Sequence, residues 1–297
     1  NIEYIVIEAS AHAIYLDKLY GIRFEGVIFT NISQDHLDYF GNMKNYINAK
    51  LKILDNKINH LVVNNTIKSL FKRNINIYGL DSKNPDSAEY LPETRCLKLN
   101  SEEIKLKING RHNAENALAA VKMSELLNID KSVIKLGLEN INQVPGRYNE
   151  FAYNGIKIIC DYAHTPDALE KVLISVRESV PGKIITVFGC GGDRDKIKRP
   201  IMGRVVSKNS DVSVITSDNP RSENPFSIIN DIKNGIEGRY IEEENRKKAI
   251  FLAVHMAEAG DCVLIAGKGC EDYQEINSIK YPYSDYKCIE EIMANKE

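Results

Sequence analysis

Several features that mark other classes of protein are missing from this sequence. It has no tryptophan, no Cys-x-x-Cys pair and no Gly-x-x-x-x-Gly-Lys-Ser/Thr phosphate loop. Its six cysteines are scattered, at Cys96, Cys160, Cys190, Cys262, Cys270 and Cys288. This scatter excludes the patterns of a disulfide framework and of a zinc site, and it indicates reduced thiols in a cytosol. We therefore expect a cytoplasmic protein.

The sequence also lacks an excess of charge and a long apolar run. Its formal net charge of -2 gives no overall attraction to nucleic acid or to an anionic membrane. No apolar run reaches the length of a membrane span. The 297 residues, of which 43% are hydrophobic and 27% charged, are typical of a globular protein that is long enough for two domains.

The start of the chain has an unusual pattern. The chain begins with Asn1 and not with Met, and its first residues, NIEYIVIE, are typical of a buried strand. A natural protein seldom begins inside a strand. We therefore expect an N-terminal part of the protein to precede this sequence.

The remaining pattern predicts an α/β protein with domains at 1–146 and 147–297. Between them, the proline and glycine of VPGR interrupt the periodicity. In the first domain, short apolar runs typical of strands alternate with helical segments. We expect strands at 4–8, 26–31 and 60–64, helices at 43–54 and 113–127, and a hairpin region at 81–94.

The second domain repeats a plan of apolar strand, polar loop and helix. Such a pattern is typical of a parallel sheet covered on both faces, and these sheets bind ligands at the carboxyl ends of their strands. Four polar loops follow predicted strands, with the sequences DYAHTP, GCGGDRDKIKRP, SDNPRSE and GKGCED. We expect these loops to meet at one edge of the sheet.

The sequence TSDNPRSENP at 216–225 allows two interpretations. Asp, Asn and Pro are ordinary turn residues, so the segment is either a surface turn before a helix or a rigid support that directs Arg221 at an anionic substrate. A similar choice applies to Glu8 and His36, which follow predicted strands. They are either satisfied structural groups or ligands of Mg²⁺, which prefers oxygen and shares its shell with phosphates.

The order of motifs resembles the Mur ligase family, and within it the synthetases that make UDP-N-acetylmuramoyl tripeptide. The motifs cover the whole chain: EASAHA, DHLDYFG, YINAK, GRHNAENALAA, VPGRYNE, DYAHTPDAL, GCGGDRDKIKRPIMG, TSDNPRSE and GKGCEDYQE. The resemblance implies a central ATPase domain with a parallel sheet, lacking its phosphate loop, at 1–146. It implies a Rossmann-like amino-acid-binding domain at 147–297. ATP and Mg²⁺ are the implied cofactors.

The resemblance assigns catalytic and metal-binding roles to Glu8, His36 and Lys50. Lys50 would be carbamylated, because a carbamate converts a cation that repels metal into an oxygen-bearing anion. Without the resemblance, Lys50 is interpreted as an exposed helix lysine. The residues implied for the nucleotide are Asn113, Arg147, Asp161 and His164. Asn113 has the alternative of being a helix N-cap.

The substrate residues are likewise implied by the resemblance. For the UDP-linked peptide they are Ser10 and Lys18, although Ala11, Leu16 and Lys18 stand where serine, glutamine and arginine are common. Lys18 keeps the charge but lacks the bidentate fork of arginine. For the incoming amino acid they are Arg194, Asp218, Asn219, Pro220, Arg221, Gly267 and Glu271. Cys270, beside Glu271, stands where histidine is usual.

The implied function is an ATP-dependent ligase of peptidoglycan precursor synthesis, and thus of cell wall biogenesis, cell shape and cell division. It would add meso-diaminopimelate to UDP-N-acetylmuramoyl-L-alanyl-D-glutamate, as a monomer with no nucleic-acid or membrane partner. Three alternatives stay open. They are a lysine-adding relative, a sister ligase such as folylpolyglutamate synthase, and an amino-acid-binding fragment without catalysis.

Overall fold

The computed structural model describes residues 2–80, 88–100 and 102–294. The chain forms two compact units, and each combines two stretches of the sequence. They are Asn1–Gly79 with Leu118–Lys131, and Leu80–Ala117 with Ser132–Glu297. Both units contain a parallel sheet, which confirms the α/β class, while the domain boundary at residue 146 stays a prediction. Within the described ranges, no helix is both long and apolar enough to cross a membrane.

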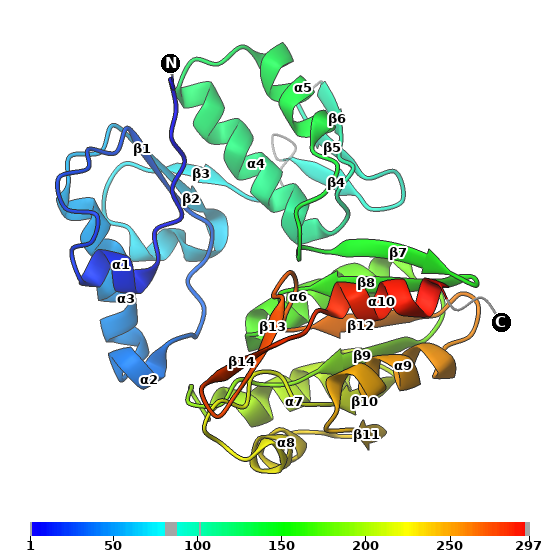
Figure 1. Ribbon diagram of the computed structural model, residues 1–297. Helices are drawn as coiled ribbons and strands as arrows, with labels where there is room; N and C mark the ends of the chain where they lie inside the picture. Colours follow the sequence, from blue (N-terminus) through cyan, green and yellow to red (C-terminus); the bar gives the residue numbers. More distant parts are fainter. Residues whose placement is uncertain (1, 81–87, 101, 295–297) are drawn as a thin grey trace. The chain divides into compact units, whose positions relative to one another are not determined.

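The first unit contains a three-stranded parallel sheet in which β2 is the central strand (Figure 1). Its strands are β1 (Gly26–Phe29), β2 (His60–Asn64) and β3 (Asn76–Tyr78). Its helical segments are α1 (Ala11–Tyr15), α2 (Leu37–Phe40), α3 (Met43–Leu51), η1 (Lys52–Asp55) and η2 (Asn65–Leu70). The strands predicted at 26–31 and 60–64 are confirmed. The helix predicted at 43–54 is also confirmed, and its last turn is the 3₁₀ segment η1.

The strand predicted at 4–8 is wrong. No strand is assigned there, and Val6 is 97% exposed. An apolar run becomes a strand only when a neighbouring strand pairs with its backbone groups, and no described strand pairs with this run. The EASAH motif therefore does not end a strand. Instead it begins α1, where the Ser10 hydroxyl caps the helix by accepting a hydrogen bond from the Ala13 amide at 3.1 Å.

The second unit begins with a small antiparallel sheet and two helices. The elements are β4 (Glu89–Leu91), β5 (Cys96–Leu99), β6 (Glu102–Lys105), α4 (Arg111–Leu126) and α5 (Lys131–Asn140). Of α4, residues 111–117 belong to this unit, and its residues from Leu118 on belong to the first unit. β4 lies within the predicted hairpin region at 81–94 and pairs with β5, which lies beyond that region, while residues 81–87 lie outside the described residues. The helix predicted at 113–127 is confirmed, and it begins at Arg111. VPGR forms a turn, closed by a bridge between Val144 and Arg147.

A six-stranded sheet dominates the second unit, in the order β11-β10-β9-β12-β8-β7. All of its strands are parallel except β7, which pairs antiparallel with β8. The strands are β7 (Asn149–Tyr153), β8 (Ile156–Asp161), β9 (Ile184–Phe188), β10 (Val212–Ile215), β11 (Tyr240–Glu242) and β12 (Cys262–Ala266). A two-stranded hairpin of β13 (Tyr273–Ile276) and β14 (Ile279–Pro282) follows.

Helices cover both faces of this sheet, as the sequence predicts (Figure 1). One face carries α6 (Pro166–Ser179), α7 (Lys198–Asn209) and α8 (Pro225–Lys233), and the other carries α9 (Arg246–Met256) and α10 (Asp285–Ala294). Neighbouring side chains of a strand point to opposite faces. In β8, Ile159 therefore packs with α6–α8, whereas Ile158 packs with α9 and α10.

A fully buried ion pair joins the first residues of α9 and α10. Arg246 donates from Nε to Oδ1 of Asp285 and from Nη2 to Oδ2, both at 2.8 Å. Nη2 also donates to the carbonyl of Ala266, the last residue of β12, at 2.9 Å. Both charged side chains are 0% exposed. This pair therefore fixes two helix ends against the carboxyl end of a central strand.

We predict that Arg246→Met lowers the free energy of unfolding by about 3–5 kcal/mol, because it leaves Asp285 as a buried and uncompensated charge. The matched control is Arg177→Met. Arg177 pairs with Asp211 at 2.7 Å, but both side chains are more than 40% exposed, so its loss should cost about 1 kcal/mol or less. Urea denaturation of the two variants measures the difference, and equal losses would contradict the prediction.

Candidate functional site

Four polar loops meet at one edge of the six-stranded sheet. They follow β8, β9, β10 and β12, which are parallel and adjacent in the sheet, so their carboxyl ends lie side by side. The loops are the DYAHTP, GCGGDRDK, SDNPRSE and GKGCED segments. Their convergence confirms the arrangement that the sequence predicts. This edge is the candidate functional site of the second unit.

The interpretation of TSDNPRSENP as a surface turn is wrong for its first half, whereas its second half reaches the surface, with Ser222 and Asn224 exposed. Residues 216–220 are all buried, with Thr216 at 0% and Asn219 at 4% exposure. The loop lies under the hairpin β13–β14: Gln274 donates from Nε2 to the Asp218 carbonyl at 2.7 Å, and the Glu275 amide donates to Asn219 Oδ1 at 2.9 Å. Only at Arg221 does the segment become partly accessible.

Close packing against this loop explains the glycines of GCGG. The Gly192 amide donates to the Asn219 carbonyl at 2.9 Å. A Cβ atom at Gly192 would lie 1.9 Å from the carbonyl oxygen of Pro220, a distance that no side chain could adopt. The glycine-rich segment is therefore a backbone-to-backbone contact between two loops.

Arg221 is held rigidly by its backbone and by its side chain. Its φ of 51° is unusual for a residue other than glycine, and its amide donates to the Glu275 carbonyl at 3.0 Å. The guanidinium donates from Nη1 to the Gly192 carbonyl at 2.8 Å, and Nε lies 3.2 Å from Oε2 of Glu275. Arg194, by contrast, is exposed, and its Nη1 donates to the Asp193 carbonyl at 3.0 Å.

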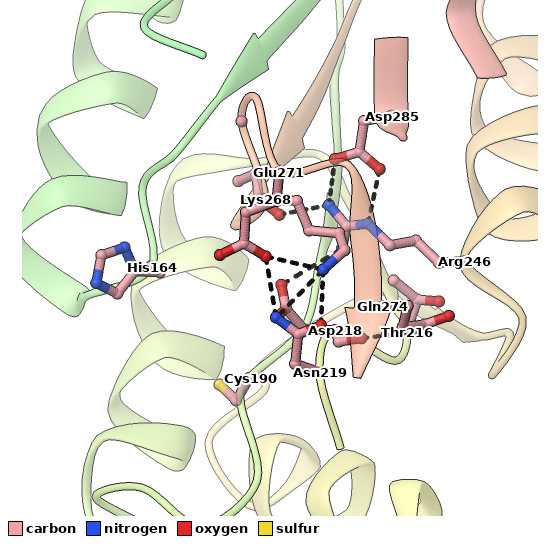
Figure 2. Close-up of polar contacts among 12 residues, drawn as sticks. His164, Cys190, Thr216, Asp218, Asn219, Arg246, Lys268, Glu271, Gln274 and Asp285 are labelled. Carbon is pink, nitrogen blue, oxygen red and sulfur yellow. Dashed lines mark hydrogen bonds and ion pairs between the residues drawn. The ribbon is translucent and has the colours of Figure 1, made fainter. Parts of the chain in front are cut away.

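A polar cluster contains Asp218 and Asn219, which precede Arg221 in the same loop, together with Lys268 and Glu271 (Figure 2). The Lys268 ammonium is 2.9 Å from Asn219 Oδ1 and 3.0 Å from Glu271 Oε2. It also lies 3.9 Å from Asp218 Oδ1. Asn219 Nδ2 donates to the same Glu271 oxygen at 2.9 Å. Three residues predicted from the sequence are thus brought together around a lysine that was not predicted.

Gly267 and Cys270 flank this cluster. Gly267 has a φ of 116°, and a Cβ atom there would lie 2.7 Å from Oδ2 of Asp218. This glycine thus allows the loop to approach the Asp218 carboxylate. Cys270 is exposed, unlike the other five cysteines, which are buried.

The residues predicted to bind nucleotide have different surroundings. The Asp161 carboxylate is buried and accepts from the Tyr148 and Ala163 amides at 2.8 and 2.7 Å. Burial raises its pKa, while the two amides lower it. Arg147 is exposed and lies 4.9 Å from the centre of the Tyr162 ring. His164 is partly buried, and its Nδ1 is 2.9 Å from the Tyr162 carbonyl.

Asn113 is not a helix N-cap, because α4 begins two residues earlier, at Arg111. Its Nδ2 donates to the Asn109 carbonyl at 2.7 Å. The alternative role that the sequence left open for this residue is therefore excluded.

Lys50, in the first unit, is partly buried and not the exposed helix lysine of the alternative interpretation. Burial lowers its pKa, and the negative charges of Asp35 and Glu8 oppose that shift. Glu8 is exposed, and His36, with a φ of 55°, has its Nε2 atom 3.4 Å from Oδ2 of Asp35. The carboxylates of Glu8 and Asp35 therefore act on the Lys50 amine.

The described residues contain no cluster of three His, Cys, Asp or Glu side chains that could hold a metal ion alone. Mg²⁺ usually keeps several waters and takes only one or two protein carboxylates together with substrate phosphates. Glu8 is exposed and His36 is only partly buried, so both side chains are accessible to a metal ion shared with a substrate, and they do not form a closed cage. Ser10 caps α1, and Lys18 is exposed just beyond that helix.

Comparison with known proteins accounts for both units. Residues 1–124 match the Mur ligase middle domain, and residues 146–269 match the Mur ligase, glutamate ligase domain. A UDP-N-acetylmuramoyl-L-alanyl-D-glutamate--2,6-diaminopimelate ligase of Clostridium acetobutylicum is 43% identical over 99% of this chain and 64% of its own length. The corresponding ligase of Aquifex aeolicus is 40% identical over 98% of this chain and 63% of its own length.

The solved structures include a ligase of the same name that shares 32% identity. Its TM-score is 0.55, and the match covers 96% of this chain and 63% of that one. This chain therefore spans less than two thirds of the length of these relatives. Since the two domain families together account for most of both units, this chain belongs to the Mur ligase family.

Proposed function

We propose that this chain is part of an ATP-dependent ligase that adds meso-diaminopimelate to UDP-N-acetylmuramoyl-L-alanyl-D-glutamate. Residues 1–146 would form the central ATPase domain and residues 147–297 the amino-acid-binding domain. The single observation that carries the proposal is the buried loop that holds Arg221 rigidly beside the Asp218–Glu271 cluster. These relatives are named as 2,6-diaminopimelate ligases, and their names support the choice of substrate.

The proposed chemistry has two steps. A carboxylate oxygen of the UDP-linked peptide attacks the γ-phosphorus of ATP, ADP leaves, and an acyl phosphate forms. The amine of the diamino acid then attacks the acyl carbon, inorganic phosphate leaves, and the amine loses a proton as the amide forms. Positioning and electrostatic stabilisation supply most of the catalysis in phosphoryl transfer, so the task of this chain is to bind and orient both partners.

In this proposal the first unit serves the activation step. Glu8, His36 and a carbamylated Lys50 would help to hold Mg²⁺, which neutralises phosphate charge when it is bound. Carbamylation requires a neutral amine to attack CO₂. The burial that lowers the Lys50 pKa favours this neutral form. Ser10 and Lys18 would contact the UDP-linked substrate.

The second unit would bind the nucleotide and the amino acid. Asn113, Arg147, Asp161 and His164 are the proposed nucleotide residues. The proposed amino-acid residues are Arg194, Asp218, Asn219, Pro220, Arg221, Gly267 and Glu271. Diaminopimelate differs from lysine by a carboxylate beside its distal amine, and a guanidinium binds a carboxylate bidentately. In this proposal Arg221 recognises the additional carboxylate, and the support is that its side chain is held by Glu275 and is still partly accessible.

We predict that Lys50→Ala lowers the turnover of an active enzyme carrying this chain by about 10–100-fold or more, because the carbamate orients the metal site. Short carboxylic acids should restore part of the rate. The control is Lys52→Ala, since Lys52 lies two residues further along the chain, is also partly buried and pairs with Asp17 at 2.8 Å. Steady-state kinetics checks the rates, and isotopically labelled bicarbonate checks the carbamate by NMR. A normal rate in Lys50→Ala would contradict the carbamate role.

We predict that the unmodified enzyme prefers meso-diaminopimelate to lysine in kcat/KM by about 10⁴ or more, because lysine leaves a polar site unpaired. Arg221→Ala should remove most of this preference by weakening the use of diaminopimelate. Arg204→Ala, an exposed arginine on α7, is the control. A preference for lysine in the unmodified enzyme, or full use of diaminopimelate without Arg221, would refute the assignment.

A further inference from the structure

Lys268 is a buried cation in the proposed amino-acid site, and its position prevents direct contact with a substrate. Its side chain is 0% exposed. Its ammonium instead contacts Asn219 and Glu271, at 2.9 and 3.0 Å, and lies 3.9 Å from Asp218. A buried lysine is costly unless carboxylates compensate its charge. The side chains that contact the Lys268 ammonium are therefore the groups that this residue can hold in position.

Lys268 fixes the orientation of the Asn219 amide. Oδ1 of Asn219 accepts from Lys268 Nζ and from the Glu275 amide, both at 2.9 Å. Two donors on one side require the carbonyl oxygen to face them. The amide nitrogen then points to Glu271 Oε2 and donates to it at 2.9 Å. The Lys268 ammonium thus contacts both side chains, as Figure 2 shows, and together with the Glu275 amide it sets the direction of Asn219.

Both donors use the same oxygen of Glu271. Lys268 Nζ and Asn219 Nδ2 converge on Oε2, and within the described chain Oε1 has no hydrogen-bond partner. The carboxylate is therefore held at one oxygen and open at the other. Since Glu271 is partly exposed, Oε1 is the atom available to accept a hydrogen bond from a ligand.

The charges of the cluster favour a cationic ligand group. Three carboxylates, Asp218, Glu271 and Asp285, surround two cations, Arg246 and Lys268, which leaves one formal negative charge. The neighbouring Arg221 and Glu275 compensate each other. An ammonium group at Glu271 would make the whole cluster neutral.

We propose that Lys268 is a positioning residue that makes the site specific for an amino acid with a distal ammonium group. It does so by holding Glu271 and Asn219 so that Glu271 Oε1 accepts that ammonium. This inference rests on the proposed function, because it assumes that the cluster binds the diamino acid. It adds one residue to the proposed site. Arg221 binds the distal carboxylate, and Lys268 positions Glu271 to bind the distal amine.

The test compares two ligands by isothermal titration calorimetry with this chain. The first is meso-diaminopimelate, and the second is 2-aminopimelate, which keeps both carboxylates and lacks the distal amine. Lys268→Met should weaken diaminopimelate binding by about tenfold or more, the usual effect of losing a charged hydrogen bond. It should change 2-aminopimelate binding by less than about threefold. Lys208→Met, which changes an exposed lysine on α7, is the control and should change neither.

A general loss of structure would weaken both ligands equally, and that result would overturn the positioning role. Unchanged diaminopimelate binding in Lys268→Met would also overturn it, while leaving the proposed function intact. If the unmodified chain binds neither ligand, the proposed function fails and this inference fails with it. Thermal unfolding monitors the fold of each variant. Should Lys268→Met not fold, Lys268→Gln, which keeps an amide donor without charge, gives the same comparison.

Discussion

The arrangement of the candidate site depends on neutralising two buried cations at the carboxyl edge of one sheet. Arg246 and Lys268 are both fully buried, and an uncompensated charge at such a depth costs several kcal/mol (on the order of 3–5). Three segments supply the carboxylates around these two cations: the loop after β10, the loop after β12 and the start of α10. The same interactions hold the fold together and shape the candidate site, so a change to one of them affects both.

The sequence predicted the features that depend on local pattern. Apolar runs of four to six residues between helices are strands of a covered parallel sheet almost wherever they occur in this chain. The start of α6 has such a local signal, because Thr165 caps the helix and Pro166 lies in its first turn. The convergence of four loops at one edge then followed from the geometry of parallel strands. The fold class and the position of the site could be predicted for this reason.

The features that were missed depend on partners far away in the sequence. The run at 4–8 has the composition of a strand, but composition does not supply a neighbouring strand. Arg246 begins the sequence RKKAI, which looks like a solvated charge cluster, and its partner Asp285 lies 39 residues further on. Lys268 sits inside the GKGCED motif, yet nothing local shows that its amine faces Asn219. The one available signal was a lysine enclosed between two glycines directly after a buried strand.

The long separation of Arg246 from Asp285 has a consequence for the order in which the protein can acquire its structure. A ribosome delivers α9 well before α10, so Arg246 emerges without the carboxylate that compensates it. The edge formed by the loops after β10 and β12 therefore cannot reach its final electrostatic balance while only the earlier strands are present. Asp285 of α10 completes that balance, so the candidate site cannot be fully compensated before α10 has been synthesised and packed.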